Sequence, residues 1–125
     1  MLAVAGRGTA WGLSPCSKSI SLCGCSINSA GVFTTNGPLS SSSLTDDCID
    51  IAGAGAVLVL FGNITGLGGA VSAAGIHILS SASNAFVTGR NTPGHGSHFS
   101  VTGFAKGIQI DASNVEVDQR MRTQF

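Results

Sequence analysis

Three residues with acid–base or hydrogen-bonding chemistry occupy the same local setting, each between two isoleucines. They are Asp50, His77 and Gln109, at the centres of I-D-I, I-H-I and I-Q-I. If the three segments pair as neighbouring strands, about 4.8 Å apart, the three outward side chains line up on one face. A carboxyl beside an imidazole can tune an acid–base group. Such a column is equally typical of a solvated sheet face, and both interpretations stay open.

A second group of acidic residues comprises Asp111, Glu116 and Asp118. Ca²⁺ takes roughly six to eight oxygen ligands. Glu116 and Asp118 share an outward face, but Asp111 falls at a turn and no neighbouring segment adds a carboxylate. We therefore expect no metal site here and no cofactor. The glycines match no phosphate-binding loop pattern.

Two aromatic residues, Phe61 and Phe86, fall at positions that are expected to face outward. Aromatic faces stack on sugar rings, so both are candidates for carbohydrate contact. They can equally cover the sheet against another segment of protein.

The chain contains four cysteines, an even number that favours disulfides and an oxidising compartment in a small, Gly- and Ser-rich protein. Inert thiols are the alternative. Cys23 and Cys25 are too close in sequence to pair comfortably with each other, and the pairing otherwise stays open. A zinc site is disfavoured because there is no C-x2-C pair and the histidines are distant in sequence. The disulfide candidates are Cys16, Cys23, Cys25 and Cys48.

Length and composition exclude several classes of protein. The 125 residues allow one domain. Charged residues make up 10% of the chain and the net charge is zero, so we expect no nucleic-acid partner. No apolar run approaches the roughly 20 residues that span a membrane. The N-terminus, interrupted by Arg7, is a poor signal peptide.

The chain repeats itself. GIHILSSASNAFVTG, from Gly75 to Gly89, closely resembles GIQIDASNVEVDQ, from Gly107 to Gln119, and a third copy, CIDIAGAGAVLVLFG, runs from Cys48 to Gly62. The first isoleucines of the copies lie 27 and 32 residues apart. Periods in this range are typical of solenoids and arrays.

Each copy predicts short strands, because apolar and polar residues alternate at period two. The I-x-I segment is followed by a second alternating run and then by a third segment, NITG at 63–66 or SVTG at 100–103. Three short strands per copy predict a parallel β-helix, in which copies bury their apolar faces by stacking. An immunoglobulin-like sandwich is the rival, and the repeat argues against it. Asn84 and Asn114 fall at the same bend, where Asn tolerates a left-handed backbone.

The segments DDCIDI, NITGLGG, AGIHILSSASNAFVTG and VTGFAKGIQIDASNVEVD resemble bacterial right-handed parallel β-helix proteins. These belong to the pectate-lyase-like superfamily, in its β-helix repeat or NosD-like variety. The resemblance covers Ser26 to Asp118 and implies an all-β, right-handed solenoid of about three rungs, with Val32 to Thr35 as an N-terminal capping strand. Val59 and Phe61 depart from the family, which usually has polar residues there.

The GHGS segment at 94–97 resembles the G-H-G motif of polygalacturonases, which share this fold and whose His supports two catalytic aspartates. The companion motifs are missing: N-T-D reads N-T-P at 91–93, Asp46-Asp47 lies too far back, and no R-I-K follows. We therefore expect a loop that contains His95 and His98.

The repeat boundaries predict three segments. They are a poorly defined cysteine-containing segment at 1–25, β-helix rungs at 26–119, and a frayed or truncated tail at 120–125, where the repeat breaks. A short stack leaves an open parallel edge. We therefore expect a fragment of a longer protein, or self-association through that edge.

The expected function is non-catalytic. We expect a segment of a secreted or cell-surface β-helix protein that presents a sheet face to a polysaccharide or another protein, because the catalytic constellations known on this fold are absent. The competing hypothesis is a polysaccharide lyase or glycoside hydrolase that acts through Asp50, His77 and Gln109, or through rungs outside this chain. Fold alone does not decide between them.

Overall fold

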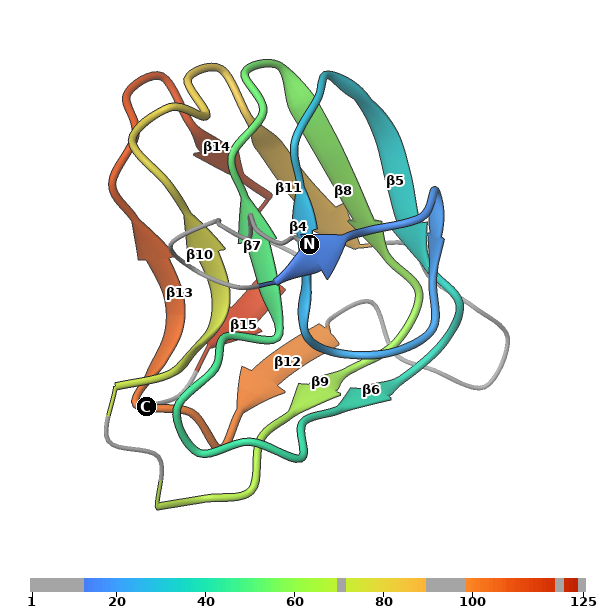
Figure 1. The fold of residues 1–125 in the computed structure, drawn as a ribbon, viewed down its shortest axis with the longest axis vertical. Helices are drawn as coiled ribbons and strands as arrows, with labels where there is room; N and C mark the ends of the chain where they lie inside the picture. The colour runs from blue at the N-terminus through green and yellow to red at the C-terminus, as the bar shows by residue number, and fades with distance from the viewer. Residues whose placement is uncertain (1–12, 70–71, 90–98, 119–120, 124–125) are drawn as a thin grey trace, which may run out of the picture.

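The computed structural model describes residues 13–69, 72–89, 99–118 and 121–123. Within these ranges the secondary structure is all β-strand, arranged in three parallel sheets (Figure 1). The first sheet contains β2 (Ser14–Pro15), β4 (Cys25–Ile27), β7 (Ile49–Ile51), β10 (Ala74–Ile78) and β13 (Lys106–Ile110). The second contains β3 (Ser19–Ile20), β5 (Gly31–Thr35), β8 (Ala56–Leu60), β11 (Phe86–Gly89) and β14 (Glu116–Val117). The third contains β6 (Leu39–Ser40), β9 (Ile64–Thr65), β12 (Phe99–Thr102) and β15 (Met121–Thr123).

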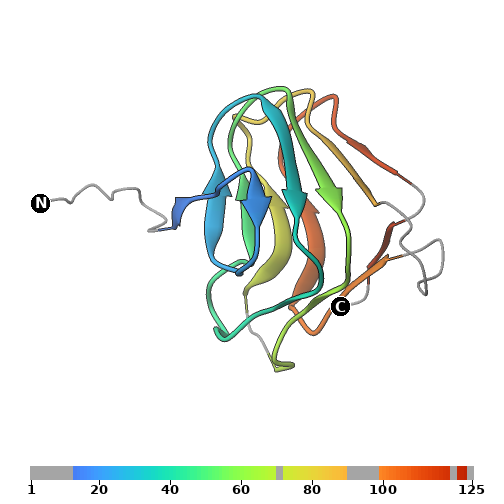
Figure 2. The ribbon, with the colours of Figure 1, turned by 90° about the vertical axis from the view of Figure 1, so that its right-hand side faces the viewer.

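Strands follow one another in chain order across every sheet. From β4 onward the chain enters the first sheet, then the second, then the third, and returns to the first. Figure 2 shows the resulting gradation of colour, from blue strands on one side to red strands on the other. Every strand pair is therefore parallel and joins residues far apart in sequence, as parallel pairing requires. This arrangement is compatible with a parallel β-helix.

The strand register confirms the predicted repeat. Ile76 pairs with Ile49 on one side and with Ile108 on the other. In the second sheet Val87 pairs with both Leu58 and Val117. In the third sheet the NITG and SVTG segments pair, as predicted. The alternation at period two sends these apolar side chains to one common interior, where Ile49, Ile76, Leu58 and Val87 have no exposed surface.

The bends between the first and second sheets confirm the prediction for asparagine. Asn84 and Asn114 both have positive φ, 63° and 58°, and the Asn84 N–H donates to Ser113 O at 3.2 Å. The glycine that follows threonine in NITG and in SVTG is required for steric reasons. A Cβ on Gly103, whose φ is +83°, would lie 2.6 Å from Gly66 O. The two neighbouring segments therefore approach closely only because both residues are glycine.

The structure extends the repeat further toward the N-terminus than the sequence suggested. Cys25, Ser26 and Ile27 pair with Ile49, Asp50 and Ile51, and so form another copy of the I-x-I segment. The strand expected to cap the stack, β5, instead lies between β3 and β8. The two-residue strands β2 and β3 escaped prediction because so short a segment carries no readable alternation.

The expected frayed or truncated tail at 120–125 lies only partly within the described residues. Its residues 121–123 form β15, which pairs in parallel with β12. Backbone hydrogen bonds build such a strand without an apolar pattern in the sequence. The repeat therefore continues one strand beyond the point where the sequence pattern breaks.

All four cysteines form disulfides, Cys16–Cys25 and Cys23–Cys48. Cys16 follows β2, Cys25 begins β4 and Cys48 precedes β7, so both bonds connect neighbouring strands of the first sheet. No thiol remains to bind zinc at these positions.

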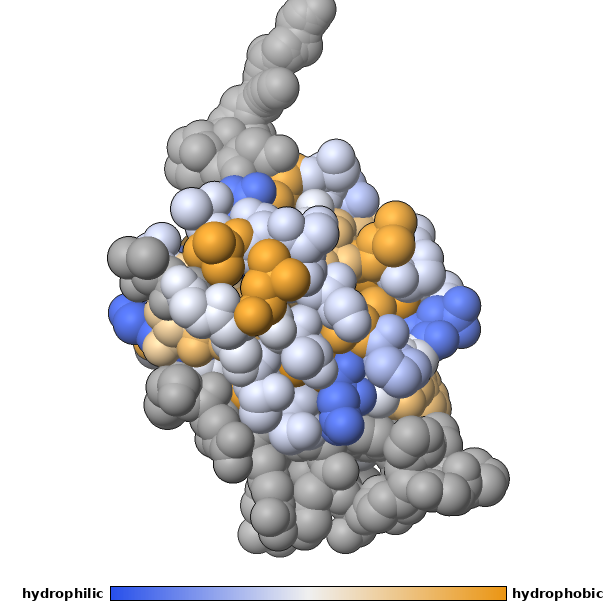
Figure 3. All heavy atoms as spheres, turned by 90° about the horizontal axis from the view of Figure 1, so that it is seen from below, coloured by the Kyte–Doolittle hydropathy of each residue, from blue (hydrophilic) through white to orange (hydrophobic). Residues whose placement is uncertain are grey.

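The surface reflects the low charge of the chain. On the face shown in Figure 3, weakly polar residues predominate, and apolar and strongly hydrophilic residues form separate groups among them. Among the described residues, the large apolar side chains that are exposed are Leu22, Val32, Leu44, Leu67 and Ile110. No helix that could span a bilayer occurs in the part of the chain described above.

Candidate functional site

The predicted polar column lies on the outer face of the first sheet. His77 on β10 pairs with Asp50 on β7 and with Gln109 on β13, and the flanking isoleucines point to the opposite face. Ser26 on β4 pairs with Asp50 and extends the column. Asp50 is not on a solvated face, however. Its side chain is buried, with 4% of its surface exposed.

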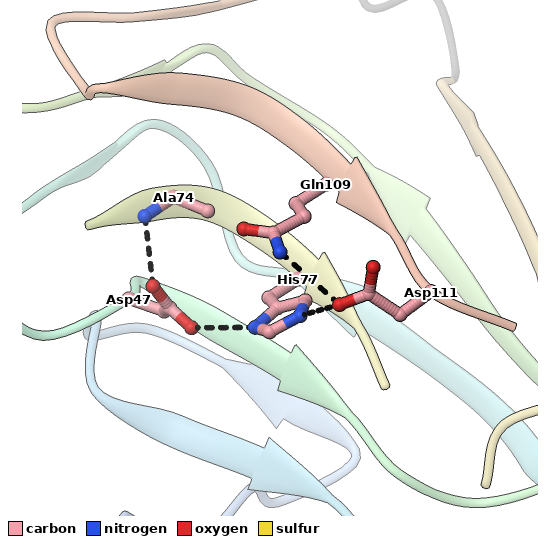
Figure 4. Close-up of polar contacts among 5 residues, drawn as sticks. All are labelled: Asp47, Ala74, His77, Gln109 and Asp111. Atoms are coloured by element: carbon pink, nitrogen blue, oxygen red, sulfur yellow. Dashed lines mark hydrogen bonds and ion pairs between the residues drawn. The ribbon is translucent and has the colours of Figure 1, made fainter. Parts of the chain in front are cut away.

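His77 is held between two carboxylates (Figure 4). Its Nδ1 lies 3.2 Å from Asp47 Oδ2, and its Nε2 lies 2.6 Å from Asp111 Oδ2. Asp47 Oδ1 also accepts the Ala74 N–H at 2.7 Å, and Gln109 Nε2 donates to Asp111 Oδ2 at 3.1 Å. Each carboxylate thus has a second partner that fixes its position, and the imidazole ring is oriented from both sides.

Neither carboxylate partner of His77 was predicted. Asp47 was judged too far back in the chain, and Asp111 was assigned to a turn. Asp47 comes just before β7 and Asp111 directly after β13, so both flank the strand that carries His77. The I-x-I alignment contained a signal for both, because it places residue 47 beside residue 74 and residue 111 beside residue 79.

The pKa values of two carboxyls near His77, those of Asp50 and Asp111, are shifted in opposite directions. Burial is the main reason that the pKa of Asp50 rises to about 8, and a hydrogen bond with Asp47 and the charges of Asp47 and Asp46 raise it further. The pKa of the exposed Asp111 is lowered, chiefly by its hydrogen bond with His77. Lys106 contributes to the lowering as a nearby positive charge.

Asp50 also has an unsatisfied atom. Its Oδ1 is buried and has no hydrogen-bond donor within reach among the described residues. A hydrogen bond with the neighbouring Asp47 carboxylate needs a proton on one of the two groups, because ionised carboxylates only accept. A buried polar atom left unpaired destabilises the fold.

These side chains surround a cavity of about 470 Å³. This volume is within the roughly 300–1,000 Å³ that is typical of small-molecule sites. Three carboxyls, one imidazole and two serines provide hydrogen-bonding groups, and one leucine provides an apolar wall. The lining residues are Asp47, Asp50, His77, Leu79, Ser80, Ser81 and Asp111.

The two candidate aromatic residues do not form one platform. Phe86 begins β11 and pairs with Val57, whereas Phe61 follows β8 four residues after Val57. At about 3.3 Å per residue, the two positions are separated by about 13 Å along the strand. Both side chains are half-buried.

The acidic trio is not gathered into one site either. Asp111 contacts His77, Glu116 lies on β14, and Asp118 Oδ2 accepts a hydrogen bond from Thr88 Oγ1 at 2.9 Å. The one group of three or more potential metal ligands in the described ranges is Asp47, Asp50 and His77. The GHGS segment, with His95 and His98, lies outside the described residues.

Comparisons of the chain with protein-family models, with curated proteins and with solved structures found no match. The functional proposal therefore depends on the cavity and its side chains, because a fold alone does not define an activity.

Proposed function

We propose that this chain is part of a right-handed parallel β-helix protein of the pectate-lyase-like superfamily and that it binds carbohydrate without cleaving it. The fold assignment is supported by the three-strand repeat, by parallel pairing in all three sheets and by the family-like segments. The binding surface in this proposal is the outer face of β7, β10 and β13.

The cavity on this face is the observation that carries the proposal. Sugar hydroxyls donate and accept hydrogen bonds, and the cavity offers Asp47, Asp111 and His77 as partners. These groups are held by neighbours rather than free to rotate, so little side-chain entropy is lost when a ligand binds. Leu79 supplies an apolar surface for the ring of a sugar.

Two further features belong to the proposal. The disulfides support an extracellular or cell-surface location, because such bonds persist in oxidising compartments. Self-association is proposed at the open edges of β13 and β14, the last strands of the first and second sheets in the described region.

A second candidate function, polysaccharide lyase or glycoside hydrolase, is favoured by the meeting of Asp47, Asp50 and His77 in one cavity. Binding is favoured instead because the catalytic constellations known on this fold are absent from the sequence.

The experiment that separates the two functions incubates the oxidised protein with a panel of insoluble and soluble polysaccharides that includes polygalacturonate. Co-sedimentation measures binding, while reducing ends and unsaturated products measure cleavage. We expect binding without product, weakened in Asp111→Asn and retained in the surface control Glu116→Gln. Product that is released by the wild type and lost in Asp50→Ala would establish the enzyme instead. Absence of binding to every polymer would refute the proposal.

A further inference from the structure

The buried carboxyl of Asp50 indicates that the cavity can bind a ligand other than a sugar. The residue lines the cavity, yet 96% of its surface is buried and its Oδ1 has no donor in reach. No N–H or hydroxyl of the described residues approaches this atom, so a proton shared with Asp47, a buried water or a bound cation has to satisfy it.

The geometry of the neighbouring ligand atoms fits a small cation. Asp47 Oδ2 and His77 Nδ1 are 3.2 Å apart, and all three ligand atoms of Asp47, Asp50 and His77 lie within 4.8 Å of one another. Two tetrahedral ligands at about 2.0–2.1 Å from Zn²⁺ are themselves about 3.4 Å apart. The Asp47–His77 pair thus already has the required separation, and the ligand atom of Asp50 lies within 4.8 Å of both.

The second nitrogen of His77 supports the same interpretation. A neutral imidazole has one N–H. When Nε2–H donates to Asp111 Oδ2 at 2.6 Å, Nδ1 directs a lone pair at Asp47 Oδ2, which is also an acceptor. This contact is favourable only with another proton or with a cation between the two atoms. Metal-binding histidines commonly donate their other N–H to a carboxylate, as His77 can to Asp111.

The charge of the cavity is unbalanced. Three carboxyls and one imidazole line it, and no lysine or arginine is among the lining residues in the described part of the chain. Lys106 is close enough to lower the pKa of Asp111, but it does not line the cavity. Four of the six acidic residues of the chain are Asp46, Asp47, Asp50 and Asp111, so most of its acidic groups are in or next to this region.

We propose that Asp47, Asp50 and His77 bind one divalent transition-metal ion of the Zn²⁺ type, with an open coordination position toward the cavity. The imidazole ligand selects this class over Ca²⁺ and Mg²⁺, which prefer oxygen ligands alone. Three protein ligands plus an open position is the arrangement of a zinc site that accepts a further ligand. The inference does not depend on carbohydrate binding, because the metal is measured with no sugar present.

The test uses oxidised protein that has been treated with a chelator and then transferred to chelator-free buffer without reductant. Zn²⁺ is titrated into it by calorimetry. We expect one ion per chain, and we expect Asp50→Asn and His77→Gln each to weaken binding by roughly tenfold or more. Ca²⁺ should give no comparable heat. Co²⁺ provides a second measurement, since a four-coordinate site absorbs strongly in the visible range.

Two controls separate this site from other ligands of the chain. Glu116→Gln removes an exposed carboxylate on β14, and the double variant His95→Gln/His98→Gln removes the other two histidines. Both should bind Zn²⁺ like the wild type. Circular dichroism identifies any variant that fails to fold, and if Asp50→Asn fails, His77→Gln carries the test.

The proposal is overturned by any of three results. They are no Zn²⁺ binding below millimolar concentration, binding that survives both Asp50→Asn and His77→Gln in folded protein, or binding that is lost in the His95/His98 control. The first is expected if a proton shared between Asp50 and Asp47 satisfies the buried oxygen.

Discussion

The outer faces of the first and second sheets are backed by the same core but carry different chemistry. Across the first sheet the outward residues are Ser26, Asp50, His77 and Gln109. Across the second, one outward row reads Val32, Val57, Phe86 and Glu116, and the other reads Thr34, Val59 and Thr88. The inward residues in the middle of both sheets, such as Ile49, Ile76, Leu58 and Val87, are apolar and buried. Strand pairing thus fixes the scaffold, and the outward position of each strand is free to specify a site.

The largest expected effect on stability comes from substitutions in the hydrophobic core that the two sheets share. Ile76, in the middle of the first sheet, is fully buried, so Ile76→Ala should lower the free energy of unfolding by about 2–5 kcal/mol. Val87→Ala on the second sheet should cost less because fewer carbons are removed. Urea unfolding measures both, with the exposed Val32→Ala as a control that changes stability by about 0.5 kcal/mol or less. An Ile76 variant as stable as the control would contradict a shared core.

The two sheets also differ in their covalent links, because both disulfides connect strands of the first sheet. The Cys23–Cys48 bond joins residues 25 apart in sequence, and its loss through Cys23→Ser/Cys48→Ser should cost about 2–4 kcal/mol, mainly through the freer unfolded chain. The Cys16–Cys25 bond closes a shorter segment of nine residues and should contribute less. Thermal unfolding of the two double variants without reductant compares them. The reverse order would show that the entropy of the unfolded chain does not control this effect.

The buried Asp50 should make the first face sensitive to pH, whereas the second face has no buried acid in its two outward rows. The pKa of Asp50 is about 8 in the folded protein and near 3.8 when unfolded. The folded state therefore binds the proton more tightly. In metal-free protein the stabilising effect of that proton is complete below about pH 4 and is lost as the pH rises to about 8, a change on the order of a few kcal/mol.

Unfolding in urea at several pH values, with chelator present, measures this dependence. Asp50→Asn should remove most of it, and Glu116→Gln should preserve it. An unchanged pH profile in Asp50→Asn would show that another group is responsible.

The smallest effects concern carbohydrate, and they compare the two faces directly. Asp111→Asn on the first face should weaken binding to a polysaccharide that the wild type binds by about tenfold, because it removes a charged hydrogen-bond acceptor. Phe86→Ala on the second face should change binding by less than about twofold. Binding isotherms on the insoluble polymer measure both. A larger loss for Phe86→Ala would move the binding surface to the second sheet and restore the aromatic residues as the main contacts.

Some features of the first face could not be predicted from the repeat pattern. Ser26 was missed as a member of the polar column because Cys25-Ser26-Ile27 begins with cysteine in place of isoleucine. Asp50 was expected among solvated residues because outward positions are usually exposed. Its burial is a property of the folded surroundings, which the I-x-I pattern does not contain.

The sequence by itself determined the strands of the repeated copies, their register and the alignment of Asp50, His77 and Gln109. Alternation at period two and a repeat near 30 residues are local properties that parallel pairing must respect. The alignment of the copies places Asp47 and Asp111 on segments beside the strand of His77, but only the tertiary structure decided that both carboxylates contact its ring, which cysteines pair and how deeply Asp50 is buried. These features depend on side-chain orientation and on the paths of the bends, which the periodic pattern does not specify.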